Sequence, residues 1–170
     1  MNMRNKDPKL TYALKSGILV HIDSVESGNA CNCICPKCQK SLCAKKKRKL
    51  DGHQSHFAHS KDSDCHGYYM TTLHLLAEQI IQEEKAVMAP AYKEIKEQRL
   101  SFKKIEVEQR NERKDLQPDV VGETDDGLRW FIEIRNTHEV DEVKKKKLIE
   151  SNITCLEIDV RGQFLENLNQ

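Results

Sequence analysis

The chain has 170 residues, with 28 Lys and Arg against 27 Asp and Glu. Its length fits one ordinary domain with a small appended module, and its periodic apolar runs exclude general disorder. The near-neutral total conceals an asymmetry, because residues 1–66 hold 12 basic and 6 acidic side chains (net +6), whereas residues 67–170 hold 16 and 21 (net −5). We therefore predict two modules, 1–66 and 67–170, of which the basic one can meet phosphate.

The cysteines indicate metal binding rather than disulfides. Six of the seven lie between Cys31 and Cys65, interleaved with histidines, and the total is odd. Metal ligation in a reducing compartment explains this pattern better than a disulfide framework. The N-terminal segment has no apolar signal region, and no apolar run is long enough to cross a bilayer. We expect a cytoplasmic protein without a membrane partner.

The first half of the chain predicts a hairpin, a ribbon and a helix. Residues 10–23 alternate apolar and polar side chains around Ser16-Gly17, which is typical of a β-hairpin. The cysteine-rich ribbon follows over residues 24–66. From residue 70 to about 84, apolar side chains recur at helical spacing, and Ala89-Pro90 then breaks the helix.

The second half predicts a mixed sheet flanked by helices, of the α+β or α/β class. Asp125-Asp126-Gly127 has hairpin-turn chemistry, so the strands on its two sides should run antiparallel. The expected elements in chain order are a strand over residues 100–109, a strand from Val120, a strand over 128–134, a helix over 141–150, a strand over 153–160 and a helical turn over 164–168.

The ribbon carries a candidate structural zinc site. Two thiolates separated by two residues, as in Cys35-Pro36-Lys37-Cys38, wrap one metal through a tight turn. His56, His59 and Cys65 compete for the other two positions, and since His56 and His59 face opposite ways on an extended strand, we predict His59 with Cys65. Four protein ligands leave no open position, which makes a structural role expected. Three thiols are left as spare or small buried residues, although their crowding leaves room for a shifted ligand set: Cys31, Cys33 and Cys43.

Two strands each carry one carboxylate that can serve a hard cation. Asp119 and Glu133 lie on adjacent predicted strands and can converge on Mg²⁺ or Mn²⁺, as phosphodiester hydrolysis requires. Arg135 shares the face of Glu133 and can hold phosphate, but it is too basic to accept a proton. The same pattern also fits the polar face of an ordinary half-buried strand, and spacing alone does not decide between these interpretations.

The chain resembles the competence protein CoiA-like family, and the resemblance covers nearly the whole chain in the expected order. It implies an N-terminal zinc-ribbon-like domain, followed by a nuclease domain of the PD-(D/E)xK restriction-endonuclease-like superfamily. The residues that carry it are Tyr12-Ala13 with the Gly17 hairpin, Cys35-Pro36-Lys37-Cys38, His56-Phe57-Ala58-His59, Cys65, His74, Pro118-Asp119-Val120 and Ile132-Glu133-Ile134.

The chain departs from the superfamily pattern at two positions. Superfamily members often place an acid on the first helix near the position of His74, and here Glu78 lies one turn later. They also carry Lys or Gln two residues after the strand glutamate, where this chain has Arg135. Glu78 can replace the helix acid, and Lys144 or Lys145 can replace the lysine; without such replacements the fold would be kept and catalysis lost.

The sequence thus predicts a metal-dependent DNA nuclease for bacterial DNA processing or phage defence. Its catalytic residues would be Asp119, Glu133 and Arg135 with Glu78 and His74. The alternative is an inactive nuclease-fold adaptor that binds nucleic acid or protein in a larger assembly, as a homo-oligomer or with a partner subunit. The basic run at residues 45–49 is either a solvated loop or a track for phosphates.

Overall fold

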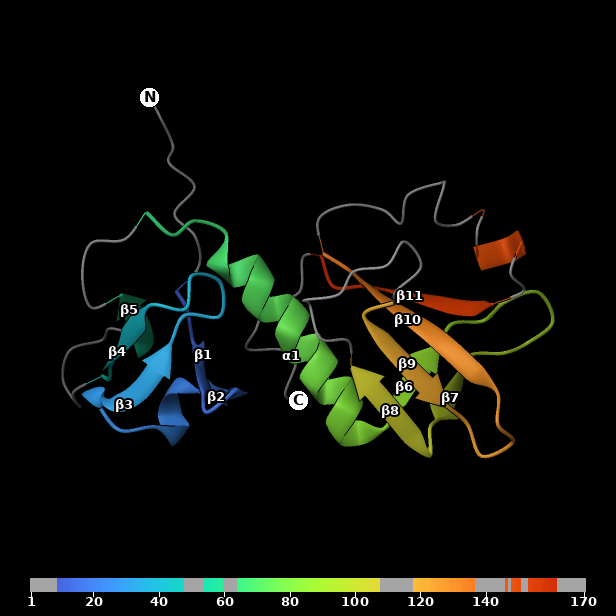
Figure 1. Cartoon of the computed structure of the whole chain (residues 1–170), viewed down its shortest axis with the longest axis horizontal. Coiled ribbons are helices and arrows are strands. Elements are labelled where there is room, and N and C mark those ends of the chain that lie inside the picture. The colour runs from blue at the N-terminus through green and yellow to red at the C-terminus, as the bar shows by residue number, and fades with distance from the viewer. Residues whose placement is uncertain are drawn as a thin grey trace, which may run out of the picture. The chain divides into compact units, whose positions relative to one another are not determined.

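The computed structural model describes residues 9–47, 54–59, 64–107, 118–136, 146, 148–150 and 153–161. These residues form a mixed α+β structure that is mostly sheet (Figure 1). Two compact units divide after Leu75, inside the single long helix of the described part, α1 (Tyr68–Glu84). Two units were expected from the charge asymmetry, and the boundary after residue 66 stays a prediction.

The first unit is built on one five-stranded sheet with the order β2-β1-β3-β4-β5. Its opening hairpin confirms the prediction from Ser16-Gly17, because Ser16 (φ 52°) and Gly17 (φ 83°) both take the positive φ that a two-residue hairpin turn of this kind requires. The strands are β1 (Tyr12–Lys15), β2 (Ile18–His21), β3 (Gly28–Ile34), β4 (Ser41–Lys45) and β5 (His56–His59), with a 3-10 turn at Ile22–Ser24.

Helix α1 confirms the helix predicted over residues 70–84. Its buried apolar side chains include Leu73, Leu76, Ala77 and Ile81, at the spacing seen in the sequence. It ends at Lys85, whose positive φ of 48° and 2.9 Å amide bond to the Ile81 carbonyl form a left-handed cap. Within the described ranges, no helix combines the length and the apolar character that crossing a membrane requires.

The second unit holds a mixed four-stranded sheet and a separate two-stranded hairpin. Strand β10 runs antiparallel to β9 and parallel to β11, so the predicted mixed sheet is confirmed. The hairpin consists of β6 (Ala86–Ala89) and β7 (Gln98–Ser101); the sheet, in the order β11-β10-β9-β8, consists of β8 (Lys104–Val107), β9 (Val120–Glu123), β10 (Arg129–Arg135) and β11 (Thr154–Asp159).

The single strand expected over residues 100–109 is wrong. The chain leaves β7 after Ser101 and begins β8 at Lys104, because Phe102 turns its ring into the core and is only 4% exposed. The Phe102 amide donates to the Lys85 carbonyl at 2.8 Å, which fixes this break. Most of the helix expected over 141–150 and all of the turn at 164–168 lie outside the described residues, although 148–150 are helical.

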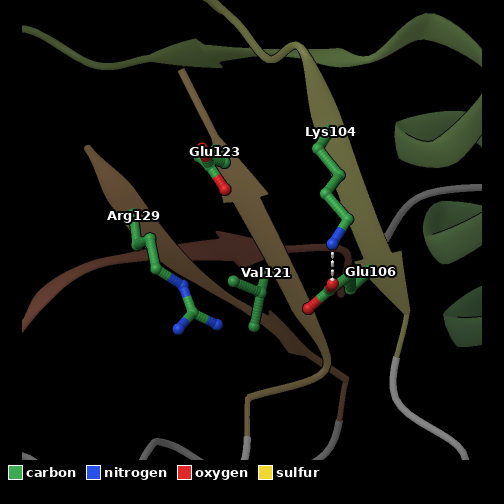
Figure 2. Close-up of a pocket in the computed structure, with 5 residues that line it drawn as sticks. All are labelled: Lys104, Glu106, Val121, Glu123 and Arg129. Atoms are coloured by element: carbon green, nitrogen blue, oxygen red, sulfur yellow. Dashed lines mark ion pairs between the residues drawn. The ribbon is translucent and has the colours of Figure 1, made fainter. Parts of the chain in front are cut away.

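One face of the four-stranded sheet is apolar and the other is charged. Val120 and Ile132 are register partners and are fully buried. On the other face an open hollow of about 270 Å³ contains as many cations as carboxylates, and Lys104 and Glu106 form an ion pair in it (Figure 2). Because its charges balance, we interpret this hollow as a solvated sheet face. Its lining residues are Lys104, Glu106, Val121, Glu123 and Arg129.

Gly122 provides a test of this core. A Cβ at Gly122 would lie 2.5–2.8 Å from the Phe102 ring, which is closer than packing allows. We therefore expect Gly122→Ala to lower the free energy of unfolding by about 1–3 kcal/mol, with partial recovery in a Gly122→Ala/Phe102→Leu double variant. Chemical denaturation of the three proteins would measure this. A Gly122→Ala variant as stable as the parent would contradict the packing described here.

Candidate metal centres

The turn that carries Cys35 and Cys38 is fixed by its own backbone bonds. The Cys35 amide donates to the Lys40 carbonyl at 2.8 Å, and the Gln39 amide donates to the Cys35 carbonyl at 2.9 Å. Gln39 has a φ of 59°, which lets the chain reverse directly after Cys38. The two thiols are therefore held at the end of β3 in the tight turn that their spacing predicts.

The other two ligands arrive from β5 and from the segment before α1. His59 is the last residue of β5, and its ring lies edge-on to Tyr68 with 6.3 Å between ring centroids. Cys65 is tied to the turn of Cys35 and Cys38 because the Lys37 ammonium donates to the carbonyl of the next residue, His66, at 2.6 Å. Segments 30 residues apart thus meet at one point.

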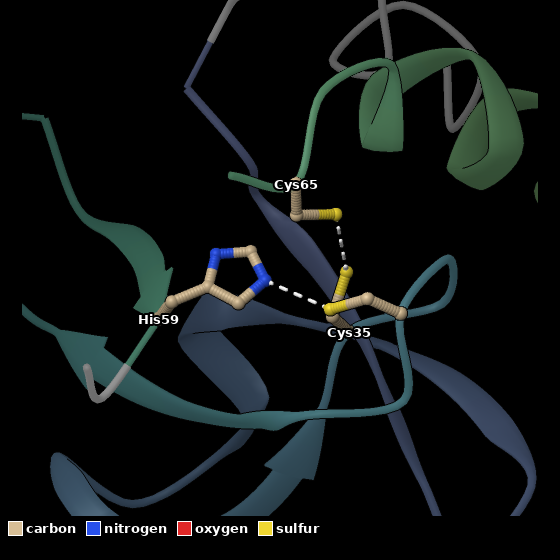
Figure 3. Close-up of side chains that lie close together, drawn as sticks. Cys35, His59 and Cys65 are labelled. Carbon is tan, nitrogen blue, oxygen red and sulfur yellow. Dashed lines mark hydrogen bonds between the residues drawn. The ribbon is translucent and has the colours of Figure 1, made fainter. Parts of the chain in front are cut away.

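The four predicted zinc ligands, Cys35, Cys38, His59 and Cys65, lie together. Figure 3 labels three of them, Cys35, His59 and Cys65. Their ligand atoms all lie within 4.8 Å of one another, with 3.9 Å between the Cys35 and Cys65 sulfurs and 3.2 Å from the Cys38 sulfur to His59 Nε2. Tetrahedral zinc would need about 3.8 Å between sulfurs and about 3.6 Å between sulfur and nitrogen. The cluster can therefore hold a metal such as zinc. His56 is not a member of this cluster, and its Nδ1 lies 3.0 Å from the Gln54 carbonyl oxygen.

The protonation states of the cluster suit a site that exchanges protons for metal. Burial, a hydrogen bond with Cys38 and the neighbouring Cys35 raise the pKa of the Cys65 thiol to about 12. Burial and the Lys40 charge lower the pKa of His59, so its imidazole is neutral at pH 7 and ready to bind metal. Burial raises the pKa of the Cys38 thiol, but hydrogen bonds, chiefly with the Lys40 backbone, outweigh this effect and lower the pKa overall. Metal binding must release the Cys65 proton, and affinity should rise with pH.

Cys31 and Cys33 are core residues, as predicted for the spare thiols. Cys31 is fully buried and donates to the Leu42 carbonyl at 3.4 Å, while Cys33 donates to the Cys31 carbonyl at 3.3 Å. Burial and the Cys31 thiol raise the pKa of Cys33 to about 12, so it stays protonated. Cys43 is half-buried on β4. Among the described residues, none of these three belongs to a metal-competent cluster.

A second cluster joins helix α1 to the start of β9. Glu78 lies on the helix one turn after His74, and a carboxylate oxygen of Glu78 lies within 4.8 Å of one of Asp119. Glu78 is 8% exposed. Two carboxylates suit Mg²⁺ or Mn²⁺. The helix acid expected from the superfamily pattern therefore has a candidate in Glu78.

Asp119 is held at the entrance of β9 by a bond to the neighbouring strand. Its Oδ2 accepts from the Ile134 amide at 2.7 Å. The last register pair is Val120 with Ile132, so Asp119 enters the sheet beside the position of Glu133. Glu133 is 8% exposed. Among the described residues it is not a member of a metal-competent cluster, so the structure brings Asp119 together with Glu78 rather than with Glu133 in one such group.

Arg135 contacts a residue that sequence reasoning missed. Its Nη1 lies 3.3 Å from Glu157 Oε1 on β11, and its side chain is 15% exposed. Glu157 is also the register partner of Glu133, so Arg135 places a cation beside two neighbouring carboxylates. The parallel pairing of residues 153–160 with 128–134 is the signal that would have identified Glu157, but strand propensity does not specify partners.

The basic residues proposed as phosphate contacts are only partly described. In the run at residues 45–49, Lys46 donates to the Asp23 carbonyl at 3.1 Å, and residues 48 and 49 lie outside the described ranges. Lys144 and Lys145, the predicted substitutes for the superfamily lysine, also lie outside them.

Comparisons with protein-family models, with curated proteins and with solved structures find no match to the chain. The resemblance to the CoiA-like family therefore rests on the sequence motifs, and membership stays a prediction.

The zinc cluster predicts a metal-dependent fold for the first unit. Purified protein should carry about one zinc per chain, and Cys35→Ser/Cys38→Ser should lose it and melt at clearly lower temperature, because so small a core depends on its ion. Cys43→Ser is the matched control and should keep both properties. Elemental analysis and thermal denaturation provide the measurements. A double variant with the zinc content and melting temperature of the parent would exclude this site.

Proposed function

We propose that this protein is a metal-dependent nuclease that hydrolyses phosphodiester bonds of DNA with Mg²⁺ or Mn²⁺. The observation that carries the proposal is the pair of carboxylates Glu78 and Asp119, at the entrance of a strand adjacent to the one that bears Glu133. Oxygen ligands from two carboxylates are the protein's usual contribution to such an ion, with substrate phosphate and water completing its coordination. The motif resemblance to CoiA-like proteins supports the same activity.

The positions of the residues suggest a different catalytic role for each. A bound divalent ion would neutralise charge on the scissile phosphate and lower the pKa of a water nucleophile. Asp119 and Glu78 would hold the ion, and the Ile134 amide, 2.7 Å from Asp119 Oδ2, keeps the aspartate oriented toward the helix. Glu133, beside Asp119, would accept a hydrogen bond from the attacking water or add a carboxylate once substrate is bound.

Arg135 would bind the scissile phosphate. Its Nη1 lies 3.3 Å from a Glu157 carboxylate oxygen, and a guanidinium has five donors. An arginine forms charge-assisted bonds to phosphate oxygens with better-defined geometry than a lysine. Glu157 would hold the guanidinium in place in the absence of substrate.

We further propose a restriction-endonuclease-like core for the second unit and a DNA-positioning role for the zinc module. The order of helix α1, antiparallel β9 and β10, and the parallel strand β11 is compatible with such a core. The positive net charge of residues 1–66 supports phosphate contact by the zinc module.

A second candidate function is a nuclease-fold adaptor without catalysis. It is favoured by the ion pair between Arg135 and Glu157. Arg135 stands at the position where superfamily members carry a lysine, and its charge is paired with a carboxylate of the protein. An adaptor would bind nucleic acid or a protein partner and would not need a divalent ion.

Cleavage assays separate the two candidates. With Mg²⁺ or Mn²⁺, the parent should cut supercoiled, linear or single-stranded DNA, and Asp119→Ala or Glu133→Ala should reduce the rate at least about 100-fold while the chain stays folded and its zinc content is unchanged. Glu106→Gln is a matched control, because this carboxylate lies in a surface ion pair with Lys104.

The expected control result is a rate within about twofold of the parent, as for most surface substitutions. If the parent cuts no DNA with either ion, or if Asp119→Ala cuts as fast as the parent, the catalytic proposal fails and the adaptor function replaces it.

A further inference from the structure

The candidate zinc ligands contact one another in two separate pairs. The Cys35 and Cys65 sulfurs lie 3.9 Å apart, whereas the Cys38 sulfur lies 3.2 Å from His59 Nε2. Figure 3 shows the Cys35 and Cys65 side chains directed toward each other. Two of the three thiols in the cluster therefore face each other directly, although they are 30 residues apart in the chain.

Both cysteines of this pair are held in place by bonds that do not involve a metal. On one side, the Cys35 amide donates to the Lys40 carbonyl at 2.8 Å. On the other side, the Lys37 ammonium donates to the carbonyl of His66 at 2.6 Å, directly after Cys65. Cys65 also packs against the buried core of the first unit. The two sulfurs should therefore stay opposite each other when an ion leaves.

The two thiols differ in their access to solvent. Cys35 is fully buried, whereas Cys65 is half-buried. A small oxidant in solvent would therefore reach Cys65 first, and the Cys35 sulfur, 3.9 Å away, would be the nearest sulfur to react with the product. Cys31 and Cys33 are less suited to compete, because both are buried and donate to backbone carbonyls.

We propose that Cys35 and Cys65 form a redox-sensitive switch, in which a hydroperoxide converts these two zinc ligands into a disulfide and the metal is released. The Cys65 thiolate would attack a peroxide oxygen and break the O–O bond, which gives a sulfenic acid and hydroxide. The Cys35 thiolate would then attack the Cys65 sulfur, forming the S–S bond and expelling a second hydroxide. The two sulfurs lose two electrons, and hydrogen peroxide with two protons becomes two water molecules.

The disulfide would replace the link that a bound zinc provides. It would join the end of β3 to the segment before α1, while Cys38 and His59 alone would leave zinc with too few protein ligands. The oxidised, zinc-free protein should therefore be more stable than the reduced, zinc-free protein, because a cross-link restricts the unfolded chain. The proposal goes beyond DNA hydrolysis, since it concerns control of the metal centre and holds for a nuclease or an adaptor.

Peroxide treatment of the zinc-loaded protein tests the proposal. A colorimetric zinc indicator should report the release of about one zinc per chain, in step with disulfide formation. Trypsin separates the three thiols of the cluster, because it places Cys35 on residues 16–37, Cys38 on residues 38–40 and Cys65 on residues 62–85. After free thiols are blocked, mass spectrometry should find peptide 16–37 joined to peptide 62–85, and fragmentation should place the bond at Cys35.

Cys43→Ser is the matched control, because Cys43 is half-buried on β4 and is not a member of the cluster. Its zinc release should proceed within about twofold of the parent's rate and give the same linked peptides. A thiol reductant with added zinc should restore the parent's zinc content, since reduction returns both ligands.

Three results would overturn the proposal. They are zinc retained in excess peroxide, zinc released while peptide 16–37 is joined to peptide 38–40 or to neither peptide, and an oxidised protein that melts no higher than the reduced, zinc-free protein. If zinc release and the expected bond are found while no DNA is cut with any divalent ion, the switch is supported and only the proposed nuclease activity fails.

Discussion

The second unit depends on how the negative charge of Glu78 and Asp119 is balanced. Their ligand atoms lie within 4.8 Å of each other, and Glu78 is almost fully buried. Two carboxylates in such a place repel each other and lose hydration, so a nearby positive charge would stabilise the pair. A bound divalent cation or a charged group of the protein can supply it. Catalysis requires the cation, and a purely structural core requires only the charged group.

In the first unit the constraint is the small size of the apolar core, and a bound metal would again compensate for it. Its apolar core is small and consists in part of Cys31, Cys33 and Cys35, and the zinc ligands come from the turn after β3, the end of β5 and the segment before α1. Zinc would join these segments covalently, which a core of this size cannot do by burial alone. Metal binding would thus supply folding energy in one unit and chemistry in the other.

Local signals were predictable from the sequence, and pairings between distant segments were not. The Ser16-Gly17 turn and the Cys35-Pro36-Lys37-Cys38 spacing specify their geometry within a few residues, and both are present as expected. The β6–β7 hairpin was not predicted. The sequence suggested that the helix is broken at Pro90, whereas α1 already ends at Lys85 and β6 begins directly after it. Glu157 was missed because parallel pairing with β10 is set by tertiary packing. For the same reason, the sequence paired Asp119 with Glu133 and left Glu78 as a substitute.

Direct binding of Mn²⁺ to the zinc-loaded protein distinguishes the two ways of balancing the carboxylates. Electron paramagnetic resonance reports free Mn²⁺, so a titration gives the stoichiometry and affinity without any substrate. One Mn²⁺ should bind per chain, and Glu78→Gln or Asp119→Asn should each weaken binding at least about tenfold, because each removes one charged oxygen ligand. Zinc content should not change. If the parent binds no Mn²⁺, or if both variants bind it as tightly as the parent, the carboxylates are balanced within the protein and the helix α1 cluster is not a metal site.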